Sequence, residues 1–513
     1  MRSVEGDDES PAHFLWAPAR YQLTRFVFLR GLGLLYFVGF LTLLLQWRPL
    51  IGSDGLLPAA TFLLRVREQL GSLAFWRLPS LFWVSSSDAA LHSLAWLGLL
   101  LSVVVALGFA NAPLLAVLWV LYLSFVHVGQ IFYGYGWETL LCEAGFLAIF
   151  LAPGLRLKPF AGAVPWPVIG LLRWLTFRIM FGAGLIKIRG DACWTDLTCL
   201  DFHYETQPLP NPFSAAFHHL PGGVHHFGVL FNHFAELVVP FGVFGPKRVR
   251  YAAGVVIIVF QSCLLASGNL SFLNWLTILI ALSCFDDAAF RALVPKRCRD
   301  SERWQELLEG RPQPLSRARR VVTGVLVTLI ALLSLNPVVN LLSPGQRMNA
   351  SFDPFSLVNT YGAFGTVNRE RNEVVLEGTA ASELTASTRW QAFELPCKPG
   401  DPARRPCFAA PYQYKLDWQM WFASFSSAGA QPWLIHLVSK LLRGDPVVDS
   451  LFAVQPFRGH PPRYVRARFY RYRFAPAGAH EYWRRELVAE YLRPLSLSDP
   501  ELSAYLAEHG FQD

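Results

Sequence analysis

Basic side chains interrupt an otherwise apolar stretch between residues 173 and 190, and they are well placed to do chemistry. The four are Arg173, Arg178, Lys187 and Arg189. A charge inside hydrocarbon is costly unless it faces protein, water or an interface. Glu143 lies in a neighbouring apolar segment, so the sequence predicts a buried ion pair between Glu143 and Arg178. A proton path or a substrate site is the alternative interpretation of the same two charges.

Two pairs of closely spaced cysteines offer a second kind of chemistry. Cys193 and Cys199 have five residues between them, and Cys397 and Cys407 have nine. Either pair can form a disulfide if a turn brings the two Cα atoms within about 7 Å. Both pairs fall in segments expected on the oxidising side of a membrane, so disulfides are the favoured interpretation. Free thiols or metal ligands are the alternative.

Histidines gather around the first cysteine pair, where imidazole and thiolate could together bind zinc. They are His203, His218, His219, His225, His226 and His233. No HxxxH or CxxC spacing accompanies them, so we expect no metal and no cofactor, and histidines that bond to backbone or water. Lys187 could act as a base if it were desolvated, although snorkelling to the interface explains it more simply.

The elements that must position these residues are membrane helices. Hydrophobic residues make up 53% of the 513 residues and the mean hydropathy is +0.32. Charged residues make up only 16%, against roughly 25% in ordinary soluble domains. Apolar windows near the ~20 residues needed to cross a bilayer predict about nine spans, some of them re-entrant or interfacial. The windows lie at about residues 27–46, 89–110, 113–132, 137–155, 165–187, 226–244, 251–268, 270–285 and 321–342.

Basic residues indicate how these spans are oriented. They are about threefold more frequent in the connectors on the N-terminal side of the membrane, which predicts a cytoplasmic N-terminus at residues 1–26. A membrane domain at 27–345 follows, with an outside loop at 188–225 and a basic cytoplasmic connector at 286–320. Residues 346–513 then form a lumenal domain. The net charge of +8 lies next to apolar segments, which predicts a lipid-bilayer partner and no nucleic acid.

The last third of the chain loses the long apolar runs and gains alternation. Residues 372–377 and 463–474 have strand-like patterns, and residues 415–422 are also predicted to form a strand. Residues 433–442 predict a short amphipathic helix. The expected fold is therefore a polytopic α-helical membrane protein with a β-rich C-terminal soluble domain.

Five stretches contain charged, aromatic or cysteine residues in a distinctive order and are not simply apolar. They are YGWETLLCEAGFLAIFLAP at 135–153, RWLTFRIMFGAGLIKIRGDACWTDLTCLDFHYETQPLPNP at 173–212, LVNTYGAFGTVNRER at 357–371, CKPGDPARRPC at 397–407 and PYQYKLDWQMWF at 411–422. Together they resemble the lipase maturation factor family, and the resemblance covers most of the chain. It is specific because apolar runs alone would match any membrane protein.

The resemblance implies a chaperone-like factor required for the folding, assembly and maturation of secreted homodimeric lipases, such as lipoprotein lipase. Such a factor would sit in the endoplasmic reticulum membrane, or in the inner membrane if the source is bacterial, with lumenal folding and redox factors as further partners. Client contact would fall on the outside loop and the C-terminal domain. The candidate client-binding residues are Trp194, Phe202, Tyr204, Trp418 and Trp421. The alternative for these aromatics is packing in their own cores or at the bilayer surface.

Two other function classes stay open. The membrane part is distantly similar to the vitamin K-dependent carboxylases, so a membrane enzyme using Lys187, His203 or Glu143 is the main alternative. A transporter would need a polar cavity at mid-membrane depth. The chain has no Ser-His-Asp order, nucleophile-elbow glycine pattern or phosphate loop, so it is not expected to be a lipase itself. Under the main interpretation, a folding factor, it is not an enzyme.

Overall fold

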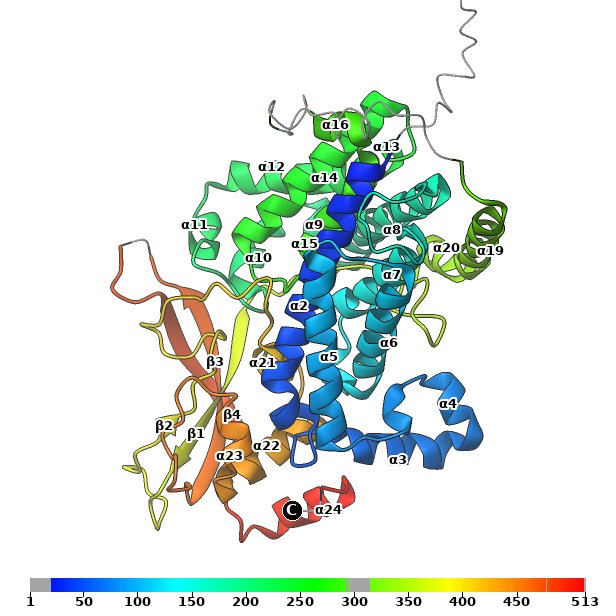
Figure 1. Cartoon of the computed structure of the whole chain (residues 1–513). Helices are drawn as coiled ribbons and strands as arrows, with labels where there is room; N and C mark the ends of the chain where they lie inside the picture. Colours follow the sequence, from blue (N-terminus) through cyan, green and yellow to red (C-terminus); the bar gives the residue numbers. More distant parts are fainter. Residues whose placement is uncertain (1–19, 292–294, 296–313, 477, 512–513) are drawn as a thin grey trace, which may run out of the picture.

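Long apolar helices make up the larger part of the molecule, and a small sheet lies beside them (Figure 1). The computed structural model describes residues 20–291, 295, 314–476 and 478–511. Most of the predicted cytoplasmic N-terminus and most of the predicted basic connector lie outside these residues. Within them, five helical segments are long and apolar enough to cross a membrane. They are α2 (Gln22–Ile51), α5 (Asp88–Ala106), α8 (Trp166–Gly190), α14 (Lys247–Ser267) and Arg317–Leu342, which combines α19 (Arg317–Leu333) and α20 (Leu335–Leu342).

The expectation of about nine spans is therefore not confirmed. Three of the remaining windows form shorter helices, namely α6 (Ala112–Val128), α7 (Gly136–Leu151) and α15 (Leu273–Ala281), which continues into η5 (Leu282–Cys284). The window at 226–244 is broken into α12 (Gly222–His233), a π-helical turn η4 (Phe234–Val238) and α13 (Val239–Gly242). Pro240 lacks the N–H that a continuing helix needs, and the polar Glu236 turns inward at the π-helical turn.

Helix α2 lies at the centre of the helical part and packs closely along α5 (Figure 1). Glycines permit the close approach. A Cβ atom on Gly98 would lie 2.2 Å from the Phe40 ring, and one on Gly33 would lie 2.6 Å from the Ala106 backbone nitrogen. The Phe40 ring also meets Tyr122 of α6 edge to face, with the ring centroids 5.4 Å apart. The helices thus interlock through small residues and buried rings.

Short helices follow α2 before the chain re-enters the helical part. They are α3 (Ala59–Leu70), η1 (Gly71–Leu73), α4 (Ala74–Arg77) and η2 (Leu81–Trp83). None is long enough to span a bilayer. Large apolar side chains such as Trp76 and Leu73 are more than half exposed there, so this segment presents an apolar face outward.

The C-terminal domain is built on one antiparallel sheet with strand order β2-β1-β3-β4. The strands are β1 (Arg371–Thr379), β2 (Gln391–Ala392), β3 (Tyr464–Phe474) and β4 (Trp483–Leu495). The strands predicted at 372–377 and 463–474 are confirmed as parts of β1 and β3. In the β1–β3 register Val375 lies opposite Arg468.

Helices pack on this sheet, and one of them corrects a prediction. The strand expected at 415–422 is wrong, because these residues form the helix α21 (Lys415–Ala423). Its buried residues Leu416, Met420 and Ala423 recur at the three-to-four-residue spacing of one helix face, and that face packs on β1. The amphipathic helix predicted at 433–442 is confirmed as α22 (Pro432–Arg443). The short helices α23 (Pro446–Asp449) and α24 (Pro500–Glu508) complete the domain.

Candidate functional site

The first cysteine pair lies in the loop predicted at residues 188–225, which follows α8 and which we call the connector. Asp191 begins the short helix α9 (Ala192–Thr195) by accepting a hydrogen bond from the Cys193 backbone nitrogen at 3.0 Å. A disulfide joins Cys193 to Cys199, with the Cα atoms 4.7 Å apart. Helix α10 (Leu200–Thr206) starts immediately after it. Both sulfurs are buried, so the disulfide fixes the shape of a segment that has little regular structure of its own.

The second disulfide joins Cys397 to Cys407, with the Cα atoms 5.4 Å apart. Its loop is anchored at both ends. The Cys397 backbone nitrogen donates to Asp417 Oδ1 at 2.6 Å, and the Cys407 carbonyl accepts from Asn269 Nδ2 at 2.9 Å. Burial raises the pKa of Asp417 to about 6, against the opposing effect of two backbone N–H groups. The loop therefore ties the C-terminal domain to the membrane helices.

Arg371 connects the connector to the C-terminal domain through several hydrogen bonds. Its guanidinium is fully buried and donates to the carbonyl oxygens of Glu205 (2.8 Å), Gln207 (2.5 Å) and Pro208 (3.0 Å). It also pairs with Glu373 at 2.5 Å. Sequence reasoning missed Arg371, although an arginine at the start of a predicted strand with a carboxylate two residues later was a usable signal. The two regions that the sequence assigned to client contact thus pack against each other.

Further hydrogen bonds strengthen the same contact. Trp194 Nε1 donates to the Phe364 carbonyl at 2.9 Å, and the Phe474 backbone nitrogen donates to Glu205 Oε2 at 2.6 Å. Arg369 reaches Asp191 with a 3.0 Å ion pair. Each bond joins the connector to a residue more than 150 positions later in the chain.

Buried ion pairs hold the helices together. Arg178 donates to both Glu143 oxygens and, at 2.6 Å, to the Asn359 carbonyl. Glu143 also accepts from Tyr361 at 2.7 Å and from the Asn359 backbone nitrogen at 3.0 Å. Both charged side chains are almost completely buried. The pair is therefore a structural junction between α7, α8 and the chain at 359–361.

Two more buried pairs were not foreseen from the sequence. Lys415 of α21 pairs with Glu138 of α7, which also accepts from the Tyr122 hydroxyl. Lys187 of α8 donates to Glu236 at 2.7 and 2.8 Å and to Asn232 Oδ1 at 2.7 Å. An ammonium group has three N–H donors, and these three acceptors match them.

A cavity of about 790 Å³ lies where the membrane helices meet the connector and the C-terminal domain. Its walls come from α8, α10, α12, α14, α15, α21 and the chain at 361–368. Four of the five aromatics chosen from the sequence line it, namely Trp194, Tyr204, Trp418 and Trp421. Phe202 is not part of the lining and instead stacks beneath Arg369, whose guanidinium carbon is 4.9 Å from its ring centroid.

These aromatics differ in the exposed fraction of their side chains. Trp194, Trp418 and Tyr204 are at most 9% exposed, whereas Phe202 and Trp421 are half-buried. Large apolar side chains that sequence reasoning missed line the same cavity and are more than one-third exposed. We call them the cavity rim, and they are Leu220, Val224, Phe227, Met348, Phe422 and Phe425.

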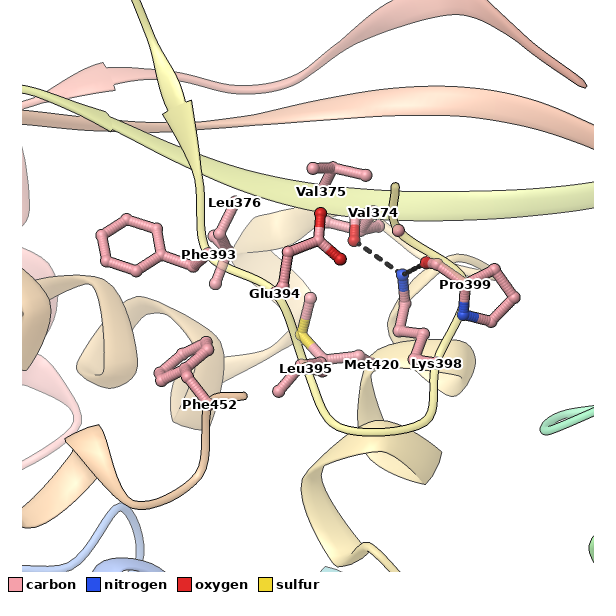
Figure 2. Close-up of a pocket in the computed structure, with 11 residues that line it drawn as sticks. Val374, Val375, Leu376, Phe393, Glu394, Leu395, Lys398, Pro399, Met420 and Phe452 are labelled. Carbon is pink, nitrogen blue, oxygen red and sulfur yellow. Dashed lines mark hydrogen bonds between the residues drawn. The ribbon is translucent and has the colours of Figure 1, made fainter. Parts of the chain in front are cut away.

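A second, much smaller cavity of about 10 Å³ lies beneath β1 (Figure 2). In it Lys398 Nζ donates to the Val374 carbonyl at 3.0 Å and pairs with Glu373 at 2.5 Å. The other lining side chains, including Phe393, Phe452 and Met420, are largely core residues (Figure 2). A space of this size holds at most a water molecule, so it is a packing feature of the domain.

The histidines near the connector have structural partners. His225 lies between Asp201 Oδ1 at 2.7 Å and the Phe217 carbonyl at 2.9 Å, and His233 Nε2 lies 2.9 Å from the Trp194 carbonyl. His203 is buried against Phe364, and burial together with the Lys187 charge lowers its pKa to about 3. Among the residues described, no cluster of three or more His, Cys, Asp or Glu side chains is arranged to hold a metal ion.

These features define a class: a multi-helix membrane protein whose disulfide-closed connector and C-terminal sheet domain form one unit over an apolar cavity. Two family models match the chain. The lipase maturation factor transmembrane domain matches residues 23–292, and the lipase maturation factor C-terminal domain matches residues 357–493. The chain therefore belongs to the lipase maturation factor family.

Curated relatives match over nearly the whole chain. Lipase maturation factor 1 of Bos taurus is 48% identical over 504 residues, covering 93% of this chain and 90% of the relative. Lipase maturation factor 1 of Homo sapiens is 46% identical over 530 residues, covering 99% and 93%. Lipase maturation factor 2 of Gallus gallus is 31% identical over 611 residues, covering 95% and 84%. No solved structure matches the chain.

Proposed function

We propose that this protein is a chaperone-like membrane factor required for the folding, assembly and maturation of secreted homodimeric lipases, with lipoprotein lipase as the representative client. Membership of the lipase maturation factor family supports a role in lipase maturation. The observation that carries the proposal is the joining of the connector to the C-terminal domain through Arg371 and Trp194. Together these regions form one continuous unit on which a client could bind.

The cavity rim is the part of this surface best suited to a client. A folding intermediate exposes apolar surface and aggregates unless it is shielded. Phe227 is 67% exposed, and Phe422 and Phe425 are 41% and 49% exposed. Isolated exposed apolar residues are ordinary, but several that line one cavity indicate an interaction site. The rim therefore supplies adaptable apolar contacts beside the disulfide-closed connector.

The five aromatics chosen from the sequence would have two different roles, depending on how exposed they are. Phe202 and Trp421 are half-buried, so they are available to touch a client directly. Trp194, Tyr204 and Trp418 are buried and would act by keeping the rim in place. Trp421 Nε1 donates to the Thr206 carbonyl at 3.2 Å, which holds α21 against the connector.

The disulfides and the apolar helices support a membrane in an oxidising compartment. Two disulfides on the connector and the C-terminal domain require an oxidising environment. The endoplasmic reticulum membrane, with both regions facing the lumen, meets that requirement, as does a bacterial inner membrane facing the periplasm. Lumenal folding and redox factors would be further partners there.

Photo-crosslinking tests where the client binds. A photoreactive phenylalanine analogue at position 425 should trap newly made lipoprotein lipase in cells, while the same analogue at position 244 should not. Phe244 is the matched control because it is 53% exposed and belongs to the segment after α13, away from the connector. Equal trapping at both positions, or trapping at position 244 alone, refutes the client surface.

The membrane-enzyme alternative is tested by removing charge without leaving an unpaired ion. Lys187→Met alone would strand the Glu236 carboxylate in a buried site, so the double variant Lys187→Met/Glu236→Gln is the appropriate change. His203→Gln is made separately. If the protein acts as a folding factor, both variants still support lipase secretion when expressed at the wild-type level. Loss of secretion at normal expression favours chemistry at these groups.

A further inference from the structure

The cavity at the junction of membrane and lumenal parts has no role in the client surface beyond its rim. We propose that its interior binds one uncharged amphiphilic lipid, with a long hydrocarbon chain and a hydroxyl or ester head group. This inference does not depend on lipase maturation, because it concerns the interior walls and is tested on the purified protein alone.

The position of the walls favours a lipid. The walls on the membrane side of the cavity come from the spanning helices α8 and α14 and from the apolar helix α15. On α8 the lining runs from Ile179 to Lys187, which is about 12 Å along the helix axis at 1.5 Å per residue. Ile179 lies near the middle of α8 and Lys187 near its end. The cavity thus extends from the connector into the depth at which acyl chains lie.

Size and lining agree with a ligand site. Pockets that enclose small molecules are commonly about 300–1,000 Å³ and combine apolar walls with a few convergent polar groups. This cavity, at about 790 Å³, falls within that range. Its apolar lining includes Met180, Phe260, Leu264 and Leu273. A hydrocarbon chain would supply the van der Waals contacts that these side chains lack when the cavity is empty.

The charges on the walls argue for an uncharged head group. Lys187 and Glu236 are the only Lys, Arg, Asp or Glu side chains that line the cavity within the described part of the chain, and they neutralise each other. Both ions are nearly fully buried, and Asn232 completes the set of bonds to the ammonium. A charged head group would enter without a counter-ion, which is costly in a site of low polarity.

Polar but uncharged groups remain on the same walls. Asn274 is 1% exposed, and its Nδ2 donates to Gln261 Oε1 at 2.7 Å. Its Oδ1 has no hydrogen-bond partner among the residues described. A buried acceptor without a donor costs free energy. Because Asn274 Oδ1 is itself covered, a small movement of the side chain toward the cavity would let a lipid hydroxyl supply the missing donor. His203 of α10 also lines the cavity and is held neutral, so it can bond to a hydroxyl or an ester oxygen.

The test uses the purified full-length protein in phosphatidylcholine nanodiscs. The probe is a monoacylglycerol carrying a diazirine in its acyl chain, and labelled peptides are identified by mass spectrometry. We expect labelling at cavity residues of α14, around Phe260 and Leu264. Excess unlabelled monooleoylglycerol should abolish that labelling, whereas the same excess of an anionic or zwitterionic lysolipid should not.

A cavity-filling variant separates the interior from the lipid-facing surface. Ala183 lines the cavity, so Ala183→Phe should reduce labelling about tenfold by occupying the space. Ala252, exposed on α14 and absent from the lining, provides the matched Ala252→Phe control, which should label like the wild type. If Ala183→Phe does not elute as a single folded species, Ala183→Leu takes its place.

The outcomes decide the proposal. Competed labelling at Phe260 or Leu264 that falls in Ala183→Phe and persists in Ala252→Phe supports it. Labelling that no monoacylglycerol competes, or that spreads over outward-facing residues such as Val255, overturns it. Competition by charged lysolipids as strong as that by monooleoylglycerol overturns the assignment of an uncharged head group.

Discussion

The buried pair between Glu143 and Arg178 allows a quantitative test of how the helices are joined. Glu143→Gln removes the charge with little change in shape. It leaves the Arg178 guanidinium buried with the Asn359 carbonyl as its remaining close acceptor. The new amide also turns an N–H group toward donors, because Glu143 accepts from Asn359 and Tyr361. Breaking such a pair costs about 3–5 kcal/mol, or roughly 10²- to 4 × 10³-fold in the folding equilibrium.

The double variant Glu143→Gln/Arg178→Met separates this cost from simple loss of packing. With both charges gone, no uncompensated ion remains, and the free energy of unfolding should recover by about 2 kcal/mol or more relative to the sum of the single variants. The assay is unfolding in mixed micelles followed by tryptophan fluorescence, at one protein concentration for all four proteins. Additivity of the single changes to within about 0.5 kcal/mol would refute the reasoning, because it would mean that the two charges do not interact.

Three further predictions concern packing, the second disulfide and acid stability. Gly33→Ala should lower the thermal midpoint because its Cβ would press on the α5 backbone, whereas Gly170→Ala, with open space around it, should leave the midpoint equal or raise it. Replacing Cys397 and Cys407 by serine should lower the free energy of unfolding by about 2–4 kcal/mol, measured with intact disulfide as the comparison. Because the pKa of His203 is lowered to about 3 from an ordinary 6.5, the unfolded chain takes up its proton first. Its stabilising contribution is full above about pH 6.5 and falls as the pH drops toward 3. The difference in the free energy of unfolding between the wild type and His203→Gln should therefore shrink on acidification. A difference that does not change with pH would contradict the burial of His203.

Local pattern sufficed for the elements whose signal lies within a single segment. The apolar runs placed α2, α5, α8 and α14 because a bilayer-length hydrophobic stretch has few alternatives. Alternation of apolar and polar residues placed β1 and β3, because a period of two is typical of a strand. Because an isolated charge in an apolar segment is costly, the sequence was enough to predict that Glu143 and Arg178 form an ion pair.

Elements that depend on contacts between distant residues could not be predicted from the sequence. The aromatics of α21 suit a strand, and the helix forms because one face packs on β1, far away in the chain. Lys415 and Glu138 are 277 residues apart, and no local pattern links them. The π-helical break at Phe234–Val238 turns Glu236 toward Lys187, again a contact between separate helices. Three-dimensional pairing of charges therefore decides what hydropathy leaves undetermined.

The cavity was also invisible from the sequence. Its walls come from segments between Gly134 and Phe425, and each contributes only a few side chains. The sequence identified four of the lining aromatics by their residue type, but their burial could not be judged without the fold. The exposed rim residues went unnoticed because single apolar residues in short helices carry no distinct signal.

The central claim is that this chain matures secreted lipases through the surface formed by its connector and C-terminal domain. The direct measurement is lipoprotein lipase activity secreted by cells that lack their own maturation factor and express either the wild type, Phe422→Ser/Phe425→Ser, or the control Phe244→Ser at equal levels. We predict that the wild type and the control restore active lipase and that the rim variant does not. Secreted activity no higher than in untransfected cells for the wild type, or full restoration by the rim variant, would contradict the claim.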